Sequence, residues 1–251
     1  MPHQLNWQEI CQMIPKRKAD AQKGDFGRLL CITGSRNMPG ACLLSTQAAL
    51  RGGAGLVTVA TAPENPMRLA AAAPEAMWLP LETDEAGFLR SSDQNRKTLE
   101  KQLSRANAVL LGCGLGVTEE TRRLVHWVLE QAVCPVVLDA DGLNCAVSCI
   151  ELSRRTGKDW ILTPHPGEMA RLTGRSIPQI QENRVETATQ FAAAYPVTLA
   201  LKGAGTLVAQ GSRLAQNPTG NPGMSRGGSG DVLAGLIAAF AAQGIPSWET
   251  A

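Results

Sequence analysis

Residues 29–61 read LLCITGSRNMPGACLLSTQAALRGGAGLVTVAT, and they set the fold class of the chain. Leu29–Thr33 is short and apolar, as expected of a buried strand, and Gly34–Pro39 is rich in turn-forming residues. Gly40–Arg51 is an Ala- and Leu-rich helical segment, and Leu56–Thr61 alternates β-branched residues, which predicts a second strand. Together these segments predict a βαβ unit, in which a helix joins two parallel strands.

Strand and helix signals keep alternating after this unit, which is typical of a parallel sheet covered by helices. Thr206–Ala209 and Arg213–Ala215 predict a hairpin, hence antiparallel strands late in the sheet. A long loop, Gln216–Gly228, leads into a predicted helix, Ser229–Ala242. We therefore expect one α/β domain over residues 1–251. The other predicted elements are strands at Ala108–Leu111, Val136–Asp139, Trp160–Leu162 and Val197–Leu201, and helices at Ser91–Arg105, Glu119–Gln131, Gly167–Thr173 and Pro178–Ala194.

Composition argues against several classes of protein. The 24 Lys and Arg residues nearly balance the 22 Asp and Glu residues, and no basic block interleaves with aromatic residues, so we expect no nucleic-acid partner. No apolar stretch approaches the ~20 residues of a membrane span, and residues 1–18 lack a signal-peptide pattern. The seven cysteines form no CxxC pair, which is typical of free thiols in a reducing compartment. We expect a cytoplasmic enzyme that acts on small molecules.

A glycine-rich loop opens the last predicted helix. Gly227-Gly228-Ser229-Gly230-Asp231 runs directly into the apolar segment Val232–Phe240. Such a loop offers backbone N–H groups and the positive end of the helix dipole to an anion, and phosphate is the natural ligand. The alternative is a glycine turn in which Asp231 only favours the helix start. A carboxylate here would repel phosphate unless a metal ion or a substrate hydroxyl lay between them, so Asp231 is the candidate base for phosphoryl transfer to a hydroxyl.

Two further loops follow predicted strands, at the edge where open α/β sheets bind their ligands. Lys202–Thr206 reads KGAGT and combines a cation, two glycines and a hydroxyl, but it lacks the spacing of a Walker A loop. His165 stands between two prolines, whose stiff backbone would fix its imidazole in the crevice. A solvated surface lysine and a structural histidine are the alternatives for Lys202 and His165.

Two aspartates flank Ala140 at the end of a third predicted strand. Asp139 and Asp141 could direct one carboxylate toward a Mg²⁺ ion that phosphates also hold. A turn and helix cap is the alternative, because Gly142 comes next.

Taken together, these loops resemble those of the ADP/ATP-dependent NAD(P)H-hydrate dehydratase family, of the ribokinase-like superfamily. The resemblance covers the chain from about Gly24 to Phe240, with its motifs in the expected order. It implies a three-layer αβα sandwich with a mostly parallel sheet and antiparallel strands near its C-terminal end. The matching stretches are Gly40-Ala41, Arg51–Leu56, Asp139–Asn144, Thr163–Glu168, Lys202–Thr206, Asn221–Met224 and Gly230-Asp231.

The resemblance implies a repair reaction on hydrated nicotinamide cofactors. The (S)-epimer of NADHX or NADPHX is phosphorylated at its C6 hydroxyl, and elimination of phosphate then regenerates NADH or NADPH. ADP, or ATP, is the co-substrate and is released as AMP or ADP, and Mg²⁺ is the expected cofactor. A kinase-like site suits this lyase reaction, because phosphate is a far better leaving group than hydroxide.

The family pattern also implies roles for individual residues. Asp231 would be the base that engages the C6 hydroxyl, while the amides of Gly228–Gly230 stabilise the transferring phosphate. Gly114 fits one substrate position almost as well as Gly116, and the spacing reveals no metal ligand set. The residues placed against the hydrated cofactor are Ala41, Gly116, His165 and Asp231. Those placed against the adenine nucleotide are Lys202, Gly203, Ala204, Gly205, Thr206 and Gly230.

Two features depart from the family pattern. Many bacterial members carry an epimerase domain ahead of the dehydratase, and the residues before Gly24 are too few for one, so we expect this chain to act on one epimer. The pattern also continues beyond Ala251 with a further helix, which suggests a clipped C-terminus. Family members tend to form homotetramers or larger assemblies, so we expect a homo-oligomer.

Two other functions are compatible with the same residues. A ribokinase-like kinase, for instance of a vitamin-precursor alcohol, would share the glycine loop and Asp231 but would release a phosphorylated product. A catalytically silent sensor would bind nucleotide without turnover.

Overall fold

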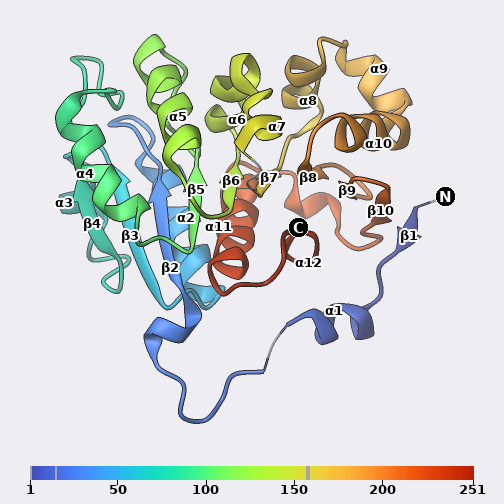
Figure 1. Cartoon of the computed structure of the whole chain (residues 1–251), viewed down its shortest axis with the longest axis horizontal. Coiled ribbons are helices and arrows are strands. Elements are labelled where there is room, and N and C mark those ends of the chain that lie inside the picture. Colours follow the sequence, from blue (N-terminus) through green and yellow to red (C-terminus); the bar gives the residue numbers. More distant parts are fainter. Residues whose placement is uncertain (1, 15, 157–158) are drawn as a thin grey trace.

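The computed structural model describes residues 2–14, 16–156 and 159–251 and contains a ten-stranded sheet between two layers of helices (Figure 1). The strands are β1 His3–Gln4, β2 Arg28–Ile32, β3 Leu56–Thr61, β4 Met77–Pro80, β5 Ala108–Leu111, β6 Val136–Leu138, β7 Trp160–Leu162, β8 Val197–Leu201, β9 Leu207–Gln210 and β10 Arg213–Gln216. Their order across the sheet is β1-β10-β9-β8-β7-β6-β5-β2-β3-β4. Strands β8 to β4 pair in parallel, whereas β9 pairs antiparallel with both of its neighbours. The predicted mostly parallel sheet with late antiparallel strands is confirmed.

Successive residues of the central strands point to opposite faces of the sheet, so each strand contributes to two cores. On β2, Leu29 and Cys31 lie in one core and Leu30 and Ile32 in the other. The helices against the first core are α2 Pro39–Arg51, α3 Asn65–Leu69 and α11 Ser229–Ala242. Those against the second are α4 Asp93–Leu103, α5 Glu119–Gln131, α6 Asp141–Ala146, α7 Leu152–Thr156, α8 Pro166–Thr173, α9 Ile177–Glu182 and α10 Arg184–Ala194. The remaining elements are α1 Trp7–Met13, α12 Ser247–Thr250 and the short 3₁₀ helices η1 Lys23–Phe26, η2 Val147–Cys149 and η3 Pro222–Met224.

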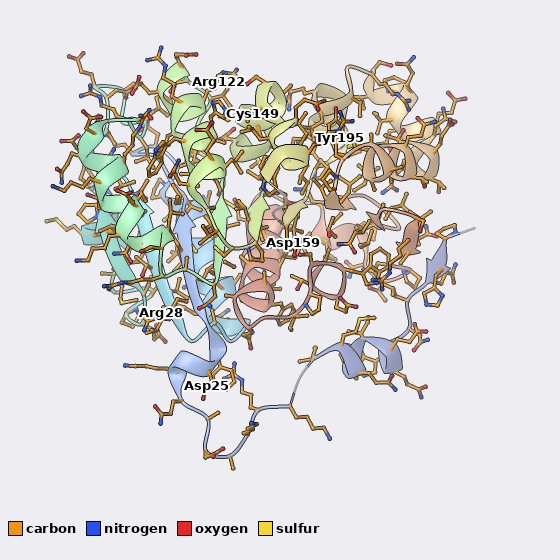
Figure 2. All side chains as sticks on the ribbon, viewed as in Figure 1. Asp25, Arg28, Arg122, Cys149, Asp159 and Tyr195 are labelled. Carbon is orange, nitrogen blue, oxygen red and sulfur yellow. The ribbon has the colours of Figure 1, made fainter. Side chains whose placement is uncertain are left out.

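Helices α2 and α11 pack closely because small residues line their contact. A Cβ atom added at Gly235 would lie 2.3 Å from the carbonyl oxygen of Ser45, so only glycine allows this approach. Both helices begin at the edge of the sheet where the parallel strands end. In Figure 2, Arg28 and Asp159 mark the amino ends of β2 and β7, and therefore the opposite edge. The glycine-rich loop before α11 thus faces the crevice edge.

The structure corrects several predicted elements. Pro178–Ala194, predicted as one helix, is two helices, because the backbone of Asn183 leaves the helical region at φ −124°, ψ 44°. The loop after β6 turns directly into α6, whose six residues are too few for a clear helical period. Strands β1 and β4 were missed because two and four residues carry little alternation. Of the helices that the structure describes, none combines the length and apolar composition that crossing a bilayer requires.

Candidate active site

Side chains from three neighbouring parallel strands meet at the carboxyl edge of the sheet. Lys202, which follows β8, donates from Nζ to Oδ1 of Asp139, which follows β6, at 2.7 Å. Thr163, which follows β7, donates from Oγ1 to the same oxygen at 2.7 Å. Lys202 Nζ also lies 3.9 Å from Oε2 of Glu168. Asp139 and Glu168 are buried, and burial raises the pKa of Glu168, an effect that the charge of Lys202 opposes. One ammonium group thus serves two buried carboxyl groups.

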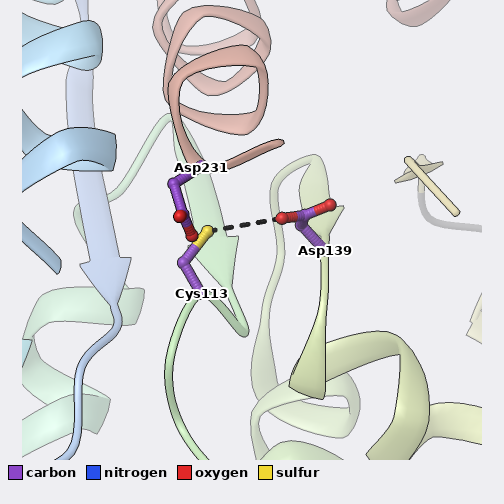
Figure 3. Close-up of side chains that lie close together, drawn as sticks. All are labelled: Cys113, Asp139 and Asp231. Atoms are coloured by element: carbon purple, nitrogen blue, oxygen red, sulfur yellow. Dashed lines mark hydrogen bonds between the residues drawn. The ribbon is translucent and has the colours of Figure 1, made fainter. Parts of the chain in front are cut away.

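Asp231 faces this cluster from the first turn of α11 (Figure 3). Ligand atoms of Cys113, Asp139 and Asp231 all lie within 4.8 Å of one another, and Cys113 Sγ donates to Asp139 Oδ2 at 3.7 Å. Burial and the nearby charge of Asp139 raise the pKa of Asp231. The same causes raise the pKa of the fully buried Cys113 thiol, so it stays protonated. We call Asp139, Glu168, Lys202 and Asp231 the polar centre.

The predicted phosphate loop joins the polar centre through Lys202. A Cβ atom added at Gly230 would lie 3.4 Å from Lys202 Nζ, so the ammonium group lies beside the first turn of α11. Gly228 adopts φ +92° at the N-cap, where a Cβ atom would lie 2.5 Å from Leu44. The first amides of a helix are available to an anion, and an ammonium group beside them adds positive charge. The glycine loop, Gly227–Asp231, and the lysine loop, Lys202–Thr206, therefore converge.

Arg184 holds the Lys202–Thr206 loop from outside the crevice, a role that sequence reasoning missed. Its Nη1 donates to the carbonyl oxygen of Ala204 at 2.6 Å, and its Nη2 donates to that of Leu201 at 3.0 Å. Gly203 has φ +146°, and a Cβ atom there would lie 2.9 Å from Arg184 Nη2. The signal lies in the break between α9 and α10, which brings Arg184 to the first position of α10. This guanidinium group fixes the predicted nucleotide loop.

A tight turn directs Asp139 and Asp141 to different places. Gly142 N donates to Asp139 O at 2.9 Å, and Ala140 adopts φ 49°, ψ −117°, the first central position of a type II′ turn. Glycine is preferred at that position, so the alanine is strained. Asp139 enters the polar centre, whereas Asp141 Oδ2 accepts a hydrogen bond from Gly116 N at 2.8 Å. The turn-and-cap interpretation therefore describes the backbone, and only Asp139 lies beside Lys202.

His165 is the N-cap residue of α8. Its Nδ1 accepts hydrogen bonds from Gly167 N at 2.9 Å and Glu168 N at 3.3 Å. Burial, followed by the positive charges of Lys202 and Arg171, lowers the pKa of the imidazole. The ring is therefore neutral near pH 7, with its hydrogen on Nε2, which lies 3.3 Å from Oε1 of Glu168, and the side chain is half exposed. The structural role is therefore present, because both ring nitrogens face groups of α8, and the substrate contact of His165 stays a prediction.

The other predicted substrate residues form a separate, apolar group. A Cβ atom added at Gly114 would lie 2.9 Å from the Cβ atoms of both Ala41 and Met38. One added at Gly116 would lie 2.3 Å from the ring of Phe88. Gly114, not Gly116, therefore lies against Ala41. Both glycines have positive φ, +66° and +77°, and Cys113, immediately before Gly114, connects this group to the polar centre.

The chain is similar to proteins of known family. A family model described as NAD(P)H-hydrate dehydratase matches residues 29–251. The chain belongs to the NAD(P)H-hydrate dehydratase family. The bifunctional NAD(P)H-hydrate repair enzyme Nnr of Coxiella burnetii is 40% identical over 240 residues, which are 95% of this chain and 46% of that protein. The chain thus spans about half the length of the bifunctional relatives that it matches.

Two shorter members of the NAD(P)H-hydrate dehydratase family match over most of their length. The ADP-dependent (S)-NAD(P)H-hydrate dehydratase of Xanthomonas campestris is 38% identical over 241 residues, 96% of this chain and 80% of that protein. A crystal structure of the ADP/ATP-dependent NAD(P)H-hydrate dehydratase of Bacillus subtilis, co-crystallised with ATP/Mg²⁺, superposes with a TM-score of 0.82 at 30% identity, covering 99% of this chain and 84% of that one. The predicted family and the ribokinase-like fold are confirmed.

Proposed function

We propose that this chain dehydrates the (S)-epimers of NADHX and NADPHX at the expense of ADP or ATP, and so repairs hydrated nicotinamide cofactors. One observation carries the proposal: Asp231, whose pKa is raised by burial, stands in the first turn of α11 next to Lys202 and the glycine loop. A base beside a phosphate-binding loop is what phosphoryl transfer to a hydroxyl requires. The substrate and nucleotide are inferred from the names of the relatives from Xanthomonas and Bacillus.

In the first step, Asp231 accepts the proton of the C6 hydroxyl while the hydroxyl oxygen bonds to the terminal phosphorus of the nucleotide. The bond between that phosphorus and its bridging oxygen breaks, so ADP leaves as AMP, or ATP as ADP. Lys202 and the amides of Gly228–Gly230 stabilise the negative charge on the transferring group. Lys202–Thr206 and Gly230 bind the adenine nucleotide, with Arg184 holding the former loop in place.

In the second step, the C6–O bond breaks and phosphate departs with the bonding electrons. The C5 proton is lost to water, and the C5=C6 double bond of the dihydropyridine ring re-forms, with no net oxidation or reduction. His165 acts here as a hydrogen-bond donor, because its Nδ1 already accepts from the amides of α8. Its Nε2–H lies 3.3 Å from Oε1 of Glu168 and is shared between that carboxylate and an oxygen of the substrate. Ala41 and Gly114 or Gly116 complete the substrate side.

The polar centre fits Mg²⁺ only as an ion that nucleotide phosphates also hold. Mg²⁺ prefers oxygen ligands and commonly takes one or two carboxylates from the protein. Asp139 would hold the ion through its carboxylate, which also accepts hydrogen bonds from Lys202, Thr163 and Cys113, whereas the Cys113 thiol is too soft a ligand for Mg²⁺. When bound, the ion would neutralise charge on the phosphates.

The test is recovery of the near-ultraviolet absorbance of NADPH from a mixture of NADPHX epimers. We expect recovery that requires ADP or ATP and stops when the (S)-epimer is consumed. A kinase would instead accumulate a phosphorylated product without that absorbance, and a silent sensor would bind nucleotide with no turnover. Separate reactions with ADP and ATP identify the donor, and light scattering tests the homotetramer that the family resemblance suggests.

A further inference from the structure

Two apolar side chains flank the glycines of the loop that follows β5. Met38, at the N-cap of α2, is 49% exposed and packs at Gly114, and the half-buried ring of Phe88 packs on Gly116. The closeness is extreme: a Cβ atom at Gly116 would lie 2.3 Å and 2.4 Å from two ring carbons of Phe88. The ring therefore rests directly on the backbone of a predicted substrate contact. We call Met38 and Phe88 the apolar wall.

Phe88 is held in place by a small hairpin. Thr83 and Leu89 form an antiparallel bridge, and within the turn Phe88 N donates to Asp84 Oδ1 while Asp84 N donates to Phe88 O, both at 2.9 Å. Gly87 allows the tight turn with φ +88°. These hydrogen bonds hold the backbone of Phe88, so less conformational entropy is lost when a ligand packs on its ring.

Arg36 ties this hairpin to the loop after β2. Its backbone N donates to Gly87 O at 2.9 Å, and its Nη1 donates to Glu85 O at 2.8 Å. The same guanidinium group pairs through Nε with Glu64 Oε1 at 2.7 Å. Arg36 therefore joins the loop that leads to Met38 to the hairpin that carries Phe88.

The wall lies on the substrate side of the polar centre. Gly114 and Gly116 lie one and three residues after Cys113, whose thiol is close to the carboxylates of Asp139 and Asp231 (Figure 3). A ligand that presents a hydroxyl to Asp231 and extends along this loop meets two glycine backbones, the side chain of Met38 and the ring of Phe88. Such a surface favours a planar, weakly polar group, because aromatic rings stack with an offset and methionine adapts its shape.

We propose that the apolar wall binds the planar N1–C2=C3–carboxamide portion of the hydrated nicotinamide ring, with Phe88 stacked on it. This inference rests on the proposed function. It makes Phe88 a specificity-determining residue, and Arg36 a positioning residue that acts through Phe88.

The experiment compares Phe88→Leu with Phe88→Tyr in the intact chain. Leucine keeps the apolar bulk but removes the ring, so we expect the KM for (S)-NADPHX to rise about 3- to 10-fold, the range that loss of a stacking contact supports. The KM for the nucleotide and the kcat should change less than about twofold, and Phe88→Tyr should keep all three constants close to wild type. Phe26→Leu, at a half-buried ring far from the crevice, is the matched control.

Arg36→Ala should raise the same KM by a smaller factor, and it should add little to Phe88→Leu in the double variant, because both changes act through one ring. Unchanged KM for (S)-NADPHX in Phe88→Leu, or an equal rise in the KM for the nucleotide, would overturn the wall.

A second readout separates this inference from the proposed function. Binding of NADPH, followed by its own fluorescence, requires no turnover and should weaken in Phe88→Leu but not in Phe88→Tyr. If wild type recovers no NADPH from its hydrate yet shows this binding pattern, the proposed activity fails and the wall stands. If the wild type is active and Phe88→Leu binds NADPH as tightly as Phe88→Tyr, the binding role of the apolar wall is rejected and the proposed activity is retained.

Discussion

The polar centre and the apolar wall lie on either side of Cys113, and the chain builds them by different means. In the polar centre, the parallel strands β6 to β8 end side by side. Lys202 and Thr163 each donate a 2.7 Å hydrogen bond to Asp139, and these bonds fix its carboxylate. In the apolar wall, glycines with positive φ let rings and methyl groups rest on the backbone. The first arrangement suits the proposed proton and phosphoryl transfer, and the second suits the proposed recognition of the nicotinamide ring. Substitutions in the two regions should therefore affect different kinetic constants.

The largest expected effect comes from Asp231→Asn. The amide cannot accept the hydroxyl proton, so kcat should fall about 10²- to 10⁴-fold, the usual contribution of a general base, while the KM for the nucleotide changes little. Initial rates of NADPH recovery measure both constants. Asp141→Asn is the matched control, because its Oδ1 can still accept from Gly116 N, and its kcat should remain within a few fold of wild type. Equal losses in both variants would remove the distinction between the two aspartates.

Lys202→Met should be the most destabilising change in the polar centre. It leaves Asp139 and Glu168 buried without their cation, and removal of one partner of a buried ion pair typically lowers the free energy of unfolding by about 3 kcal/mol. Urea denaturation measures that loss, and calorimetry should also show weaker nucleotide binding. Adding Asp139→Asn should restore part of the stability but none of the nucleotide affinity. Full stability in the single variant would mean that water replaces the ammonium group.

Arg184→Met should separate nucleotide binding from substrate binding. Loss of the bonds to the carbonyl oxygens of Leu201 and Ala204 frees the lysine loop, so the KM for the nucleotide should rise about tenfold, as expected when hydrogen bonds from a charged group worth about 1.5 kcal/mol are lost. The KM for (S)-NADPHX should hold. Arg175→Met is the control. Arg175 also donates hydrogen bonds to α10, but to the side chains of Thr187 and Gln190 and not to the lysine loop. A similar rise in the control would indicate a general loosening of α10.

The raised carboxyl pKa values predict opposite pH dependences for activity and stability. In the proposed mechanism Asp231 acts as a base only when ionised, so kcat/KM should fall as the pH drops through a pKa above the ordinary aspartate range. For a carboxyl group with a raised folded-state pKa, the stabilising contribution is present below the unfolded pKa and is lost as pH rises through the folded one. Asp231 and Glu168 both shift in this direction. As the pH is raised, the urea midpoint of the wild type should therefore fall relative to that of Asp231→Asn.

The sequence predicts the polar centre better than the apolar wall, for a physical reason. Lys202 and Asp231 each follow a recognisable local pattern, a strand end and a helix start, and parallel topology then brings them together. Phe88 reaches Gly116 only through Arg36 and the hairpin turn, contacts that no periodicity encodes. The role of Arg184 was missed for a similar reason. The helical pattern continues through Asn183, and the break between α9 and α10 at that residue depends on tertiary packing. Motifs at strand ends and helix starts can be predicted from the sequence, whereas tertiary contacts between loops cannot.

The smallest effect compares two alanines, one beside each region. Ala140 holds a positive φ in the turn that directs Asp139 into the polar centre, whereas Ala41 is buried in α2 against Gly114. Ala140→Gly relieves strain and should raise the free energy of unfolding by about 1 kcal/mol, after allowing for the greater freedom of glycine in the unfolded chain. Ala41→Gly should lower it by about 1 kcal/mol, because a helix loses its best former. The same substitution thus has opposite signs, measurable as opposite shifts in the urea midpoint. If Ala140→Gly also lowers kcat, strain at Ala140 helps to hold Asp139 beside Lys202. An unchanged kcat would mean that the bonds from Lys202 and Thr163 suffice to fix that carboxylate without it.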